Sequence, residues 1–203
     1  MIITDSWTFI HIPRTGGVAF KMAFLQQNKG LIKGRDFVNY AYERQDQLRP
    51  PSISDLPNMA NFGAEHALVN HWESLIPENS QLFTIVRHPY ERFQSICRRA
   101  YDTAQNDEDR ARAINIDEVL NDPGYGCWRP SNTQKEYLDS TTKSITVYKY
   151  ETDYANVYSD HSLTSVGVMN ESINQTNMLT AENIVRLNEH YHDDFVEFGY
   201  TKS

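Results

Sequence analysis

Cysteine and long apolar runs are both scarce in this 203-residue sequence. Its two cysteines, Cys97 and Cys127, are too few for a disulfide framework or a zinc site, so a reducing compartment is the simpler expectation. No apolar run reaches the roughly 18 residues of a membrane-spanning helix, and we expect no membrane span. Residues 1–6 lack a basic segment followed by an apolar stretch, so we expect no signal peptide and a cytoplasmic location.

Positive charge is also in short supply, because the chain has a formal net charge of −8. This balance argues against a general nucleic-acid-binding protein. The exception is the segment 87–99, which carries four arginines (Arg87, Arg92, Arg98 and Arg99) against a single glutamate. One concentrated basic segment in an acidic protein predicts a site for a specific anion. The alternative is a solvated, charged helix face.

Repeats, low-complexity tracts and the two best-known nucleotide-binding motifs are missing: neither G-x-x-x-x-G-K-[ST] nor G-x-G-x-x-G occurs. What is present is an alternation of strand and helix patterns in a chain that is 39% hydrophobic and 12% aromatic. Strands are predicted at 7–12, 82–86 and 144–150, with a possible short strand at 61–67 and a helical turn after it. Helices are predicted at 17–27, from Pro89 onward, at 134–138 and at 181–191, and 106–122 is partly helical. This order predicts one α/β domain over 1–203, with a mainly parallel central sheet flanked by helices, whose ligands bind at the carboxyl ends of the strands.

The first candidate site follows the first predicted strand, where the chain reads Pro13-Arg14-Thr15-Gly16-Gly17 before a helix. Strand, glycine turn and helix together form a cradle of backbone N–H groups that suits an anion. Adjacent glycines let the backbone approach an anion closely, Thr15 adds a hydroxyl, and Arg14 adds a permanent charge. An ordinary strand-to-helix turn is the alternative interpretation.

The second candidate site follows the strand 82–86. On a helix that starts at Pro89, one face carries the apolar or small side chains of Tyr90, Phe93, Cys97 and Ala100, and the other carries Arg92, Ser95 and Arg99. The first face can pack on the sheet while the second faces a ligand. We therefore expect Arg87 and the Ser95 hydroxyl to hold a phosphate. Two anion sites at the ends of two strands predict a ligand with phosphates at both ends of a nucleoside.

The ordered pair "HIPRTGG" and "VRHPYERFQS" resembles the two cofactor loops of sulfotransferases that use 3′-phosphoadenosine 5′-phosphosulfate (PAPS). The carbohydrate sulfotransferase branch is the most similar, with first and second loops that usually read H-x-P-K-T-G-G and R-x-P-x-x-R-x-x-S. The stretches "AEHALVNHW", "RPSNTQKEYL", "VYKYE" and "YHDDFVEFGY" also look like family features, so the resemblance covers nearly the whole chain. It implies a P-loop-like, sulfotransferase-type fold and the transfer of a sulfuryl group from PAPS to an acceptor hydroxyl, expected on a carbohydrate.

The resemblance also implies roles for individual residues. The backbone N–H groups of Thr15, Gly16, Gly17, Val18 and Ala19, with the Thr15 hydroxyl, would bind the 5′-phosphosulfate, and Arg87 and Ser95 would bind the 3′-phosphate. Arg14 stands where the family normally has lysine. An arginine there can stabilise charge on the leaving phosphate oxygen but does not readily donate a proton.

Sulfuryl transfer also needs a base for the acceptor proton, and His66 is our candidate because an imidazole has a suitable pKa. Glu65 and His71 remain alternatives. No metal site is expected; His190 and His192, two residues apart on a predicted helix, point to different sides. Two other classes stay open: a nucleotide-phosphate kinase or hydrolase, for which no Walker lysine is evident, and a non-catalytic nucleotide-binding protein that kept the fold.

Overall fold

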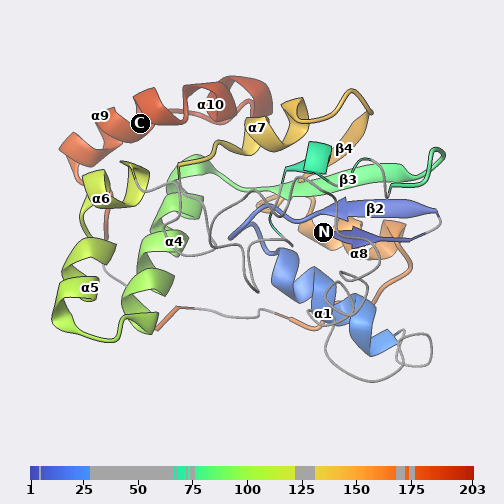
Figure 1. Ribbon diagram of the computed structural model, residues 1–203, viewed down its shortest axis with the longest axis horizontal. Helices are drawn as coiled ribbons and strands as arrows, with labels where there is room; N and C mark the ends of the chain where they lie inside the picture. Colours follow the sequence, from blue (N-terminus) through green and yellow to red (C-terminus); the bar gives the residue numbers. More distant parts are fainter. Residues whose placement is uncertain are drawn as a thin grey trace.

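The computed structural model describes residues 1–4, 6–27, 66, 68–71, 73, 76–121, 131–167, 172–173 and 177–203 (Figure 1). Its sheet has four strands in the order β1–β2–β3–β4: β1 (Ile2–Ile3), β2 (Trp7–Ile10), β3 (Gln81–Val86) and β4 (Ile145–Lys149). β2, β3 and β4 are parallel, and β1 pairs antiparallel with β2 at the edge. The predicted α/β class with a mainly parallel sheet is therefore confirmed, and the short antiparallel strand β1 is an addition.

Helices surround this sheet. In chain order, the described elements are α1 (Gly17–Gln27), the 3-10 helix η3 (Val69–His71), α4 (Pro89–Thr103), α5 (Asp107–Ala113), α6 (Ile116–Asn121), α7 (Gln134–Asp139), α8 (Tyr154–Asp160), α9 (Ala181–His190) and α10 (His192–Phe198). The predicted helices at 17–27, from Pro89, at 134–138 and at 181–191 are confirmed to within about a residue. The possible strand at 61–67 falls almost wholly outside the described residues, and α8 and α10 were not predicted.

Strand side chains alternate between two apolar layers, as a buried parallel sheet requires. On one face, Phe9, Phe83 and Ile85 pack with Phe20 of α1 and Val157 of α8. On the other face, a second cluster joins strand residues to α7 and α10; it includes Ile10, Leu82, Val86, Tyr137 and Phe198. Figure 1 shows the same arrangement, with α1 and α8 on one side of the strands and α7, α9 and α10 on the other. The sheet is thus covered by helices on both faces.

Helix α4 begins where its sequence predicts. His88 is the N-cap residue, its Nδ1 accepts a hydrogen bond from the Tyr90 amide, and Pro89 occupies the first turn, where a missing N–H costs nothing. Tyr90, Phe93 and Cys97 are buried, as predicted, but they pack in a cluster with α6, α9 and α10 that contains no strand residue, and not on the sheet. The opposite face differs from the prediction, because Arg92 is also buried and only 1% exposed. Among the described helices, none is long and apolar enough to cross a lipid bilayer.

Candidate functional site

The two predicted anion sites lie at the same edge of the sheet. β2 and β3 are parallel and pair in register, with Ile10 opposite Thr84, and β3 pairs in the same sense with β4. The segments that follow their carboxyl ends therefore emerge side by side. They are the glycine loop 11–16, the residues 87–88 before α4, and the residues 150–153 before α8.

The glycine loop owes its shape to two left-handed backbone conformations and to aromatic packing. Gly16 has a φ of 94° and Arg14 has a φ of 65°. Residues other than glycine rarely adopt such positive φ values. A Cβ at Gly16 would lie 2.8 Å from ring atoms of Tyr150, and a Cβ at Gly17 would lie 2.3 Å from Cδ2 of His11. The glycine pair is therefore required by the rings packed on it. The sequence had instead suggested close approach to an anion, which stays a prediction.

The loop leads directly into α1, whose first N–H groups have no acceptor within the helix. The Gly16 carbonyl accepts from the Ala19 amide at 3.1 Å and also from the Tyr154 hydroxyl at 2.9 Å. Thr15 is fully buried, and its hydroxyl donates to the Ile12 carbonyl at 2.9 Å. Val18, which is partly exposed, and the buried Ala19 belong to the first turn. The segment thus has the strand–turn–helix shape of an anion cradle. The Thr15 hydroxyl and the Ala19 amide, both expected to bind the anion, donate within the protein instead.

Arg14 and Ser95 meet, although 81 residues separate them. The Arg14 Nε donates a hydrogen bond of 3.0 Å to the Ser95 Oγ, and both side chains are partly exposed. This contact joins the glycine loop to the second turn of α4. Because the Ser95 oxygen is the acceptor, its own O–H remains a donor for another group.

Arg87 lies at the start of the second loop, with its guanidinium over the Tyr150 ring and its Cζ 4.9 Å from the ring centroid. The Tyr150 ring therefore contacts both Arg87 and the Gly16 backbone. The Arg87 Nη2 is a loose 3.6 Å from Glu91, and the Arg87 Nε is buried with no hydrogen-bond partner among the described residues. A buried, unsatisfied N–H is costly, so this atom marks a place for an acceptor such as a phosphate oxygen.

Arg92, which the helix pattern had placed toward a ligand, has a different position. Its Nε donates to the Pro13 carbonyl at 3.2 Å and its Nη1 donates to the Asn132 carbonyl at 3.0 Å. Its guanidinium also lies over the Tyr191 ring, 6.0 Å from the centroid. The expectation that Arg92 faces a ligand is therefore wrong. It is a buried link between the glycine loop, α4 and the segment before α7.

Two residues that the sequence did not single out also reach the site. Gln134, at the start of α7, forms hydrogen bonds of 2.8 Å to both the N–H and the carbonyl of Arg87. Asp194 of α10 accepts from the Gln134 amide at 2.9 Å. Both lie in stretches that resemble family features, "RPSNTQKEYL" and "YHDDFVEFGY", which was the only sequence signal that could have pointed to them.

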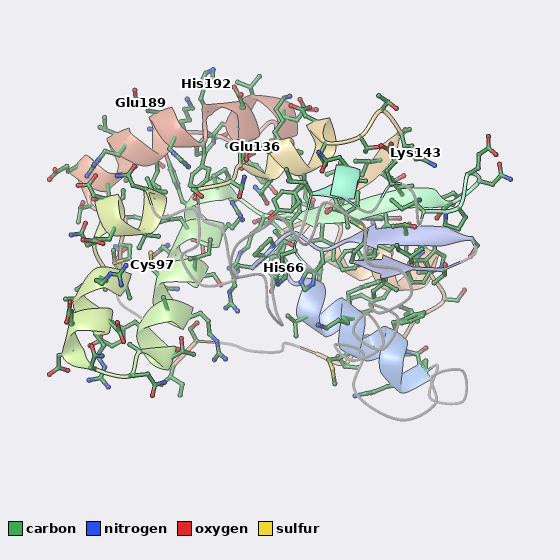
Figure 2. The ribbon with its side chains drawn as sticks, in the orientation of Figure 1. His66, Cys97, Glu136, Lys143, Glu189 and His192 are labelled. Carbon is green, nitrogen blue, oxygen red and sulfur yellow. The ribbon has the colours of Figure 1, made fainter. Side chains whose placement is uncertain are left out.

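His66 is buried beside the start of α1, as Figure 2 shows. Its Nδ1 lies 3.0 Å from the His11 carbonyl oxygen, and the two imidazole rings meet edge to face with centroids 4.3 Å apart. Since a carbonyl only accepts, Nδ1 must carry the proton, and Nε2 holds the lone pair in the neutral ring. This is the tautomer that a base acting through Nε2 requires. Glu65 lies outside the described residues, as does the side chain of His71.

The described part of the chain holds no group of three or more candidate metal-ligating side chains. The prediction that His190 and His192 share one helix is wrong. α9 ends at His190 and α10 begins at His192, with Tyr191 between them. His190 interacts with the Ser131 carbonyl and His192 with Lys202.

Comparisons with protein-family models, with curated proteins and with solved structures returned no match to this chain.

Proposed function

We propose that the protein transfers a sulfuryl group from PAPS to an acceptor hydroxyl, expected on a carbohydrate, and that its fold is of the P-loop-like sulfotransferase type. The observation that carries this proposal is the Arg14–Ser95 hydrogen bond. It joins the two motifs that define the resemblance at one edge of the sheet, as a nucleotide with phosphates at both ends would require.

The residues present fit such a nucleotide. The N–H groups from Thr15 to Val18 at the start of α1 would bind the 5′-phosphosulfate, because helix N-termini favour anions. The Ala19 amide already donates to the Gly16 carbonyl. Arg87 and Ser95 would bind the 3′-phosphate. The support for this is the buried Arg87 Nε, which has no partner among the described residues, and the Ser95 hydroxyl, which can still donate. When bound, PAPS supplies the activated sulfuryl group, and no metal is required.

Catalysis would then depend on charge stabilisation and on positioning. Arg14 is permanently charged, so it would stabilise negative charge on the leaving phosphate without giving up a proton. Its hydrogen bond to Ser95 holds the guanidinium toward the second loop. His66, with its proton fixed on Nδ1 by the His11 carbonyl, would accept the acceptor's proton at Nε2.

Calorimetry with 3′-phosphoadenosine 5′-phosphate and with AMP tests the binding half of the proposal. We expect clearly tighter binding of the bisphosphate, because only it contacts Arg87 and Ser95 as a 3′-phosphate. Equal affinities would refute the proposal. Transfer of radiolabelled sulfate from PAPS to a panel of glycan acceptors tests the catalytic half. Selective binding of the bisphosphate with no transfer to any acceptor would identify a non-catalytic nucleotide-binding protein.

A further inference from the structure

A fully buried carboxylate on α10 fixes the start of α7. Asp194 has no exposed surface, and it accepts three hydrogen bonds from N–H donors. Its Oδ2 accepts from the Gln134 amide at 2.9 Å and from the Gln134 Nε2 at 3.2 Å, and its Oδ1 accepts from the Lys135 amide at 2.8 Å. Burial raises the pKa of this carboxyl, while the nearby Arg92 and the N–H donors act in the opposite direction. With three donors around it, Asp194 serves as an acceptor only.

That acceptor fixes the orientation of the Gln134 side chain. An amide can often be rotated by half a turn without an obvious loss, but here Nε2 must face the Asp194 carboxylate. Oε1 then accepts from the Arg87 N–H, and Nε2 also donates to the Arg87 carbonyl, both at 2.8 Å. Gln134 is fully buried, and both of its side-chain N–H groups are used within the protein. It therefore has no side-chain N–H left to donate to a ligand.

Arg87 depends on this backbone support because little holds its side chain. The Arg87 Nη2 is a loose 3.6 Å from the Glu91 Oε2. The contact with the Tyr150 ring face restrains the orientation of the guanidinium only weakly. The position of the guanidinium thus follows from the position of the Arg87 backbone. Gln134 fixes that backbone at two points, on the first residue after β3.

We propose that Asp194 and Gln134 are positioning residues that hold the Arg87 backbone and thereby set the preference for a nucleotide with a 3′-phosphate. This inference rests on the proposed function, since it assigns Arg87 to the 3′-phosphate. It assigns to α7 and α10 a part in nucleotide selection, although neither Asp194 nor Gln134 touches the nucleotide.

The test compares Gln134→Met, which keeps the side-chain length and removes both bonds to Arg87, with Thr8→Val. Thr8 is equally buried, and its hydroxyl shares a 2.8 Å hydrogen bond with Ser80 at the opposite end of the strands. Affinities for 3′-phosphoadenosine 5′-phosphate and for AMP are measured by calorimetry in both variants and in the parent protein. Both variants should melt earlier than the parent.

Only Gln134→Met should lose selectivity. We expect its affinity for the bisphosphate to fall about ten-fold, because small misplacements of a binding group are costly, while its affinity for AMP stays unchanged. Retained selectivity in Gln134→Met, or an equal loss in Thr8→Val, would overturn the inference and leave the proposed function standing. A parent protein that does not distinguish the two nucleotides would instead overturn the proposed function, and the inference with it.

Amide hydrogen exchange on the unmodified protein keeps the inference testable if Gln134→Met does not fold. The Arg87 amide lies beyond the end of β3, yet its bond to Gln134 predicts slow exchange. Rapid exchange at this amide would refute a positioning role. Asp194→Asn provides a second variant, since it leaves one carbonyl oxygen to serve three N–H donors, and it should also lower selectivity for the bisphosphate.

Discussion

Replacement of Arg87 by alanine should weaken binding of 3′-phosphoadenosine 5′-phosphate by about ten- to a hundred-fold. A hydrogen bond to a charged group contributes roughly 1.5 to 3 kcal/mol, and each 1.4 kcal/mol is about ten-fold in affinity. The stability of the protein should hardly change. The only ion pair that Arg87 forms among the described residues is the loose, half-exposed contact with Glu91, and such surface pairs contribute little. The variant also removes the buried Arg87 Nε–H, which has no hydrogen-bond partner among the described residues, so its removal breaks no hydrogen bond there.

The assay is calorimetric titration of the parent and the variant with the bisphosphate and with AMP. Arg110→Ala is the matched control, because it changes the net charge equally but lies on α5, where Arg110 is paired with Asp107 at 2.7 Å. Affinity for AMP should be the same in all three proteins. If Arg110→Ala weakens bisphosphate binding as much as Arg87→Ala, the effect is long-range electrostatics. If Arg87→Ala weakens both nucleotides equally, Arg87 does not bind the 3′-phosphate.

Three further expectations concern other parts of the molecule. Arg14→Lys should keep or raise turnover and Arg14→Ala should abolish it, so full sulfate transfer by the alanine variant would contradict the role of Arg14. His66→Ala should lower turnover by about 10² to 10⁴ without changing nucleotide affinity, and normal turnover in a variant that folds and binds would make Glu65 the residue to test. The His161 ring stacks on Phe83 with centroids 3.8 Å apart, and burial lowers the pKa of its imidazole despite the opposing charge of Asp160. Below about pH 6.5 the unfolded chain therefore takes up a proton that the folded protein resists, and stability is lost as the pH falls through this range. The urea midpoints at pH 7.5 and pH 5 should differ less in His161→Phe than in the parent protein. Equal differences in the two proteins would argue against this reasoning.

Strands β2 and β3 were predictable from the sequence because they are mostly apolar and buried on both faces. Residues 82–86 differ from β3 by only one position, and Pro89 marked the start of α4 through its fixed φ. The edge strand β1 was not predictable, since two residues carry no periodicity. Helix α8 was missed because only Val157 and Tyr158 of its seven residues are buried, which leaves too few apolar positions for a helical pattern.

The sequence allowed us to select site residues that belong to a local motif, but not to predict the contacts between them. Arg14 and Ser95 were both selected from the sequence, but their contact depends on how α4 packs beside the glycine loop. Helix periodicity placed Arg92 on a polar face and could not show that carbonyls of Pro13 and Asn132 would cover it. Pairings between residues so far apart in the chain arise from the tertiary fold, and no local pattern encodes them.

The bonds made by Arg92 have a consequence for the order of folding. They join α4 to Pro13, 79 residues away, and to Asn132, 40 residues away. Contacts between residues so distant in sequence require large loops to close, and they form slowly compared with contacts inside one helix. We therefore expect the glycine loop to reach its final shape only after α4 and the segment before α7 have docked. During refolding, the capacity to bind a nucleotide should return later than helical structure does.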